Sequence, residues 1–128
     1  MFYTGADWGL KVDNTVISTF TVGKDNVDYL VHWTIPAKEL GIMGHVKTFD
    51  NIIGKYQGPA SYDGTGMTQF VPEVLENPAY SVPWQNKKLI TELMNRFVSD
   101  VQSRKIKIPR IRSLERDIRY LTFEQALS

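Results

Sequence analysis

The sequence contains no cysteine and only two histidines. Without cysteine there is no disulfide, thiolate metal site or cysteine nucleophile, and we expect a protein of a reducing, intracellular compartment. No stretch approaches the roughly eighteen apolar residues of a membrane span, and the N-terminus lacks the pattern of a targeting signal. Fifteen basic against fourteen acidic side chains give a net charge of +1. Any affinity for nucleic acid must therefore come from local charge.

The 128 residues, of which 42% are hydrophobic, suit one compact domain with a core of its own. Runs rich in apolar and β-branched residues predict a three-stranded antiparallel meander over residues 2–8, 15–22 and 27–35. Residues 23–26 supply turn chemistry between the second and third strands, and Pro36 ends the third.

Apolar residues at steps of three and four then predict a helix over roughly residues 38–56. The remaining chain predicts a strand at 60–62, a helix at about 68–75, a strand at 79–83, an amphipathic helix through 89–101, an extended piece at 106–109 and a last helix at 114–123. This order predicts an α/β fold with a mixed sheet, antiparallel in its first three strands and parallel in the later ones, flanked by helices.

Two aspartates stand where predicted strands end. Asp7 closes the first strand between Gly5 and Gly9, and Asp63 follows the strand at 60–62 and precedes Gly64. Because ligands collect at the carboxyl ends of strands in such sheets, we expect Asp7 and Asp63 at one edge. An aspartate beside glycine is also typical of an ordinary turn, and Asp13 has the same alternative.

Five segments, in order, resemble the nuclease domain of phage large terminase subunits: GADWG followed by DNTVI, YDGTGM, KKLI at a helix start, IKIP, and SLERDIRYL. The resemblance extends over nearly the whole chain. It implies a ribonuclease H-like (RuvC-like) fold and the activity of that family, which cuts concatemeric viral DNA during packaging.

The resemblance also implies two-metal phosphodiester hydrolysis with Mg²⁺ or Mn²⁺ ions roughly 4 Å apart. Asp7 would bridge both ions and Asp63 would hold one, as the catalytic carboxylates, while Asp13 would be a direct or water-mediated ligand. Carboxylate oxygen suits such hard cations.

Two parts of the family pattern are missing. Its third acid follows the last helix in an Asp-rich segment that the sequence up to Ser128 does not contain, and no G-x-x-x-x-G-K-[ST] phosphate loop occurs. We therefore expect a single nuclease-like domain over residues 1–128, without the end that carries the third acid and without an ATPase domain.

The densest basic stretch follows the amphipathic helix. It would be a solvated surface, with Glu115 and Asp117 offering i,i+4 pairs, or a flank that contacts DNA phosphates in a salt-sensitive way. We predict the second and assign DNA contacts to Lys87, Arg104, Lys105, Lys107, Arg110 and Arg112. The histidines, His32 and His45, are expected to be structural or exposed, and Trp8, Trp33 and Trp84 to lie in the core or at a partner contact.

The leading hypothesis is a metal-dependent DNA endonuclease domain of a viral packaging terminase large subunit, acting in the cytoplasm of an infected host cell. Its expected partners are double-stranded DNA and, as candidates, the terminase small subunit, the portal or a separate ATPase, with no membrane. The alternative is a catalytically impaired nuclease-like module that binds DNA or assembles. An actin-like ATPase is disfavoured, because that family needs a second related half and a nucleotide pocket.

Overall fold

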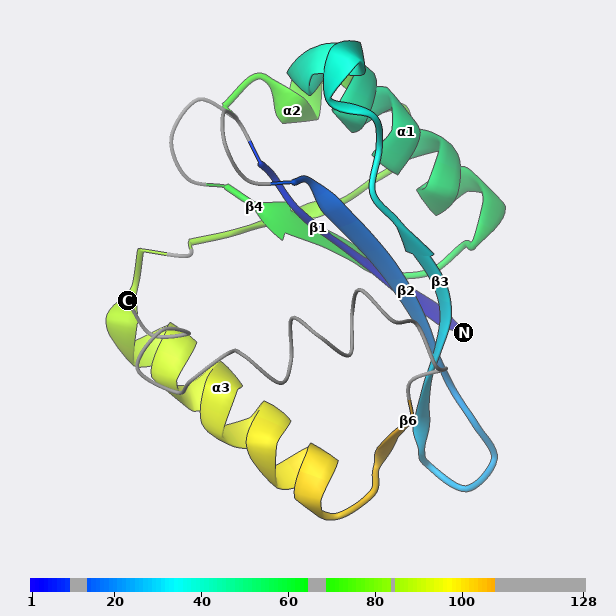
Figure 1. Ribbon diagram of the computed structural model, residues 1–128, viewed down its shortest axis with the longest axis vertical. Coiled ribbons are helices and arrows are strands. Elements are labelled where there is room, and N and C mark those ends of the chain that lie inside the picture. The colour runs from blue at the N-terminus through cyan, green and yellow to red at the C-terminus, as the bar shows by residue number, and fades with distance from the viewer. Residues whose placement is uncertain (10–13, 65–68, 84, 108–128) are drawn as a thin grey trace.

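The structure, a computed structural model, describes residues 1–9, 14–64, 69–83 and 85–107. At its centre is a six-stranded sheet in the order β5-β4-β1-β2-β3-β6 (Figure 1). The strands are β1 (Phe2–Asp7), β2 (Val16–Val22), β3 (Asp28–Thr34), β4 (Ala60–Asp63), β5 (Tyr80–Val82) and β6 (Ile106–Lys107). β1, β2 and β3 pair antiparallel, whereas β4, β5 and β6 each join a neighbour in parallel. The predicted mixed sheet is confirmed.

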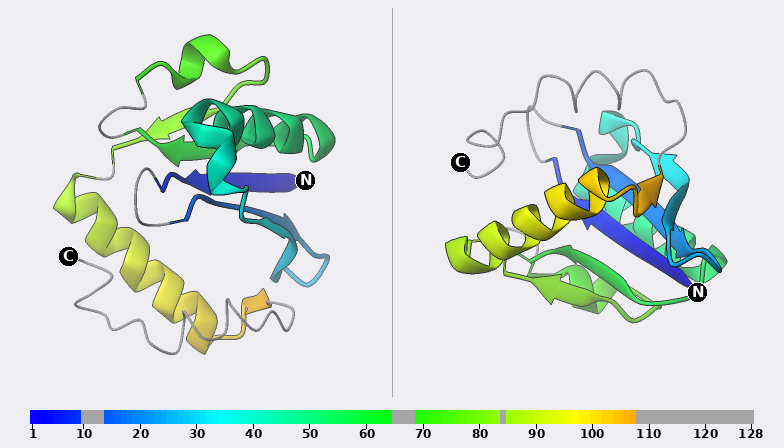
Figure 2. Two further views of the ribbon diagram at one scale, coloured as in Figure 1. Left: turned by 45° about the horizontal axis from the view of Figure 1, so that its top comes forward. Right: turned by 90° about the horizontal axis from the view of Figure 1, so that it is seen from below.

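In the part of the chain that the structure describes, four helical segments flank this sheet: η1 (Lys38–Leu40), α1 (Gly41–Lys55), α2 (Val71–Val74) and α3 (Lys87–Gln102). Figures 1 and 2 show α1 and α3 on opposite sides of the sheet. The helix predicted at 68–75 is only four residues long, because Leu75 is already extended with φ −68° and ψ 130°. The helix predicted at 114–123 lies outside the described residues.

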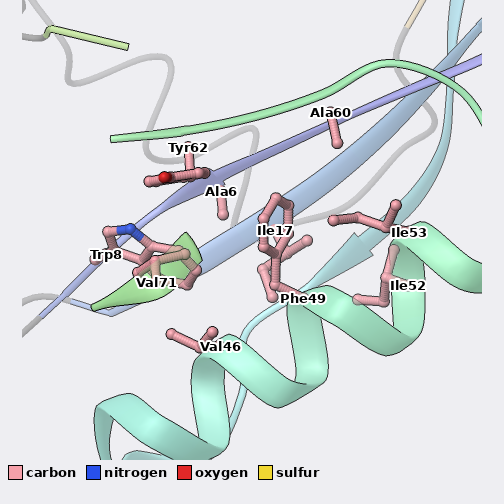
Figure 3. Packing of buried hydrophobic residues seen from close by; sticks show 10 residues of the cluster. All are labelled: Ala6, Trp8, Ile17, Val46, Phe49, Ile52, Ile53, Ala60, Tyr62 and Val71. Carbon is pink, nitrogen blue, oxygen red and sulfur yellow. The ribbon is translucent and has the colours of Figure 1, made fainter. Parts of the chain in front are cut away.

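The core fills the space between α1 and one face of the sheet (Figure 3). Strand side chains alternate between faces, so Ala6, Ile17 and Tyr62 all point toward α1. From the helix, the fully buried Phe49 meets the ring of Trp8 at 5.5 Å and that of Tyr62 at 6.3 Å, both edge-on. Burying a large apolar side chain stabilises a fold by about 1.5–3 kcal/mol, so this cluster holds α1 against the strands.

The same alternation sets the residues between these core positions on the other face. They are Gly5 and Asp7 in β1, Ser18 in β2, and Ser61 and Asp63 in β4. The face away from α1 therefore carries small and polar groups near the ends of β1 and β4. Within the described residues, no helix combines the length and apolar character that crossing a bilayer requires.

Candidate metal and nucleic-acid site

Asp7 and Asp63 end two strands that lie side by side. β1 and β4 are parallel, with Gly5 opposite Ser61 and Ala6 opposite Tyr62, and each aspartate is the next residue of its strand. Neighbouring strands are about 4.8 Å apart, so the register brings the two carboxylates to adjacent positions at one edge. The sheet thus unites the two acids that the sequence singled out.

Both aspartates line a cleft of about 430 Å³ on the face away from α1. Its other lining residues are Gly5, Ala6, Val16, Ser18, Ser61, Tyr62 and Val82. Gly5 lies opposite Ser18 on one side and Ser61 on the other, which makes a row of small residues across three strands. A Cβ built on Gly5 would meet nothing within 4 Å, so this row borders open space.

Ser18 and Ser61 were not singled out in the sequence. Their signal was present but weak, since each is a small polar residue that alternates with buried positions of its strand. Only the register shows that they face the same cleft as the aspartates.

Behind this edge, on the α1 side, lies His45. Its side chain is 3% exposed, with Nδ1 2.7 Å from the Thr15 hydroxyl and Nε2 2.9 Å from the Ala37 carbonyl. His32 is partly buried, and its ring lies 5.5 Å from that of Tyr56. The expectation of structural or exposed histidines is consistent with both positions. Trp8 lies in the core, as expected.

The predicted DNA-binding residues separate into two places. Lys87 begins α3 five positions after Val82, the β5 residue that pairs with Asp63, so this end of the helix lies toward the acidic edge (Figure 1). Lys105 and Lys107 follow the far end of α3, where β6 pairs with the start of β3. A 16-residue helix spans about 24 Å, so the basic stretch around β6 is remote from the two carboxylates.

The residues at that remote end have contacts of their own. Lys107 Nζ lies 5.5 Å from the centre of the Tyr29 ring, and the Tyr29 hydroxyl donates to Asp25 at 2.8 Å. Arg104 has a positive φ of 58° in the turn that joins α3 to β6.

Several predicted site residues lie outside the described part of the chain. They are Asp13, Arg110 and Arg112, together with Trp84. Among the residues that the structure does describe, no three His, Cys, Asp or Glu side chains come together as a metal-binding group. Among the described residues, the groups at the acidic edge that could bind a metal ion are the Asp7 and Asp63 carboxylates, with the hydroxyls of Ser18 and Ser61 in the same cleft.

The chain is similar in fold to two solved structures, a terminase nuclease and a Holliday junction resolvase. The large terminase nuclease from the thermophilic phage G20c, solved with bound zinc, superposes with a TM-score of 0.82 at 14% sequence identity, over 99% of this chain and 78% of that one. The yeast mitochondrial Holliday junction resolvase Ydc2 superposes with a TM-score of 0.54 at 10% identity, over 98% of this chain and 73% of the resolvase. No protein-family model matches the sequence, and a search of curated proteins finds no match. With the strand order and the helices on both faces, these superpositions show that the chain has a ribonuclease H-like fold.

Proposed function

We propose that the chain is a metal-dependent DNA endonuclease domain of a viral DNA-packaging terminase large subunit. The observation that carries this proposal is the pair of carboxylates, Asp7 and Asp63, at adjacent strand ends in an open cleft. Two like charges side by side are tolerated best where a cation neutralises them.

The donor set fits a hard divalent cation. Asp7 and Asp63 supply carboxylate oxygens and Ser18 and Ser61 supply hydroxyls, the kinds of ligand that Mg²⁺ and Mn²⁺ prefer. Asp7 and Asp63 would hold the metal, with Asp13 as a further ligand. When bound, such ions activate water and stabilise the charge on the leaving oxygen of a phosphodiester. The zinc bound to the G20c nuclease supports a divalent cation.

The chain itself would position the DNA. Gly5, which has no side chain, and the small side chains of Ser18 and Ser61 leave room for a sugar–phosphate backbone against the sheet, and the serine hydroxyls can donate to phosphate oxygens. Lys87 and Lys88 open α3 at its N-terminal end, where the helix dipole also favours negative charge. Contacts of this kind hold the backbone without reading the base sequence.

The terminase assignment rests on the fold comparison. The superposition on the G20c nuclease has the higher TM-score, 0.82 against 0.54 for the resolvase, although the identity is only 14%. Together with the ordered sequence segments, this favours DNA packaging over junction resolution as the setting of the cleavage.

A plasmid-nicking assay with Mn²⁺ tests the proposal. We expect wild-type protein to nick supercoiled DNA and Asp7→Asn or Asp63→Asn to lose the activity. Loss of an outer-shell partner costs about 10- to 100-fold, so loss of a direct ligand should cost at least about 100-fold. Asp25→Asn, at the far end of the sheet, is the control and should nick as wild type does. Equal nicking by wild type and Asp7→Asn would refute the proposal.

A DNA-binding or assembly module without catalysis is the second candidate. It is favoured by one observation: no group of three metal-ligating side chains occurs among the described residues. Calorimetric titration distinguishes the two. Absence of Mn²⁺ binding, together with DNA binding that weakens as salt rises, would support the module and exclude the nuclease.

A further inference from the structure

A buried polar network holds the two ends of the segment that joins β1 to β2. Thr15, 1% exposed, accepts a hydrogen bond from the Gly9 amide at 2.9 Å and lies 2.7 Å from His45 Nδ1. His45 in turn reaches the Ala37 carbonyl through Nε2 at 2.9 Å. Three separate parts of the chain therefore meet at one hydroxyl and one imidazole.

The hydrogen-bonding roles in this network follow from the chemistry of its members. A carbonyl can only accept, so His45 Nε2 carries a hydrogen and donates it to Ala37. In the neutral imidazole Nδ1 then accepts from the Thr15 hydroxyl, which keeps its lone pairs for the Gly9 amide. The Gly9 carbonyl lies 3.4 Å from the same hydroxyl, whose single hydrogen is directed at the shorter contact with Nδ1. The Thr15 hydroxyl therefore joins the histidine to Gly9, two residues beyond the end of β1.

The network lies directly behind the acidic edge. Asp7 pairs with Val16 as the last pair of the β1–β2 ladder, and the Gly9–Thr15 bond closes the hairpin just beyond that pair. Thr15 and Ile17 point toward α1, whereas Val16 and Asp7 line the cleft. The network can therefore fix the backbone of Asp7 without occupying the space of a metal ion or of DNA.

We infer that His45 and Thr15 are positioning residues for the metal-binding end of β1. This inference rests on the proposed function and adds to it a role for α1, which anchors the Asp7 strand end through His45.

Thr15→Val tests the inference, since valine keeps the shape of threonine and removes the hydroxyl. We expect the Gly9 amide to exchange with solvent at least about tenfold faster, and the calorimetric Kd for Mn²⁺ to rise about tenfold, the range of lost outer-shell partners. Thr15→Ser restores the hydroxyl and should restore both values. Thermal melts by circular dichroism establish that each variant is folded at the temperature of measurement.

Thr19→Val is the matched control. Thr19 is fully buried in β2, the strand that Thr15 directly precedes, and its hydroxyl bonds that of Thr4 at 2.9 Å, away from the acidic edge. We expect this variant to be destabilised but to bind Mn²⁺ as wild type does. Equal weakening by Thr19→Val and Thr15→Val, or wild-type affinity in Thr15→Val, would overturn the inference and leave the nuclease proposal standing. No Mn²⁺ binding by wild type would instead overturn the nuclease proposal, and the inference with it.

Discussion

Gly58 lies close against the backbone of β1, just before the chain enters β4. Its φ is +157°, and a Cβ placed on it would lie 1.9 Å from the carbonyl oxygen of Phe2. That oxygen belongs to the backbone and cannot rotate away as a side chain would. Any other residue at this position must push the β4 entry away from β1.

We expect Gly58→Ala to lower the free energy of unfolding by about 2 kcal/mol or more, the scale of local backbone strain. Urea denaturation measures it. Gly5→Ala is the control, because its Cβ would meet nothing within 4 Å and alanine is favoured over glycine within a strand by roughly 0.5–1 kcal/mol. Similar destabilisation by both changes would contradict the close approach at Gly58.

Some residues of the candidate site could be predicted from the sequence, and others could not. Asp7 and Asp63 stand out because an acid at a strand end beside glycine breaks an apolar pattern. Ser18 and Ser61 do not stand out in this way. Their face depends on the pairing register of the strands, and a shift of that register by one residue would turn them to the other face of the sheet. His45 could not be placed either, because its partner Thr15 lies 30 positions away in the chain.

Asp50 connects two elements, since it lies on α1 and holds the segment between α2 and β5. Its carboxylate accepts from the Asn77 amide at 3.0 Å, the Asn77 side chain at 3.0 Å and the Glu76 amide at 3.2 Å. This segment leads into β5, the strand that pairs with the Asp63 end of β4. The aspartate thus helps to fix the edge of the sheet beside the cleft.

We expect Asp50→Ala to lower the free energy of unfolding by about 2 kcal/mol, because hydrogen bonds to a charged group contribute roughly 1.5–3 kcal/mol and these are partly exposed to water. Chemical denaturation measures the loss. Asn51→Ala, at the neighbouring exposed position of α1, is the control and should lie within about 0.5 kcal/mol of wild type. A loss of the same size at both positions would rule out the connection.

The β2–β3 hairpin contains a hydrogen bond from the Tyr29 hydroxyl to the Asp25 carboxylate, and this bond depends on the ionisation of Asp25. The hydrogen bond from Tyr29, followed by that from the Val27 amide, lowers the pKa of Asp25 below its ordinary value of 3.8. The contribution of ionised Asp25 to stability is therefore present above pH 3.8 and is lost as the pH falls through the lowered pKa. The same bond raises the pKa of Tyr29 above 10.0, so its contribution is lost as the pH rises through that higher value.

We expect Tyr29→Phe to bring the pKa of Asp25 back up toward 3.8, because the phenol that stabilises its charge is gone. An NMR titration of the Asp25 carboxyl carbon measures the shift. Tyr3→Phe, at an exposed tyrosine of β1, serves as the control and should leave the Asp25 titration unchanged. An unaltered titration in Tyr29→Phe would mean that the phenol is not the main cause.

At the level of elements, the order of strands and helices was predictable because periodicity and turn residues mark each one locally. The position of the basic stretch relative to Lys87 was not predictable, because the length of α3 separates the two in space. Lys87 and Lys107, which were both predicted to contact DNA, lie at the start of this helix and just beyond its end. Local patterns predict elements, whereas the distances between their ends depend on packing.

The whole molecule should gain stability when a divalent cation binds, because only the folded state brings the Asp7 and Asp63 carboxylates to adjacent strand ends. At a Mn²⁺ concentration 100 times the Kd, binding adds about 2.7 kcal/mol to the free energy of unfolding. We therefore expect a higher Tm with Mn²⁺ than with EDTA, measured by scanning calorimetry. Asp7→Asn should lose most of this increase, whereas Asp25→Asn should keep it. An equal increase in all three proteins would indicate binding elsewhere.

The alternation along β1 has a consequence for how such a domain can change over evolution. Thr4, Ala6 and Trp8 serve the packing under α1, while Gly5 and Asp7 serve the cleft on the opposite face. Selection on stability and selection on the chemistry of the cleft therefore act on interleaved but separate positions of one short stretch, residues 4–8. Substitutions that reshape the cleft floor need not disturb the hydrophobic core, so the same scaffold can change what its cleft binds while it continues to fold.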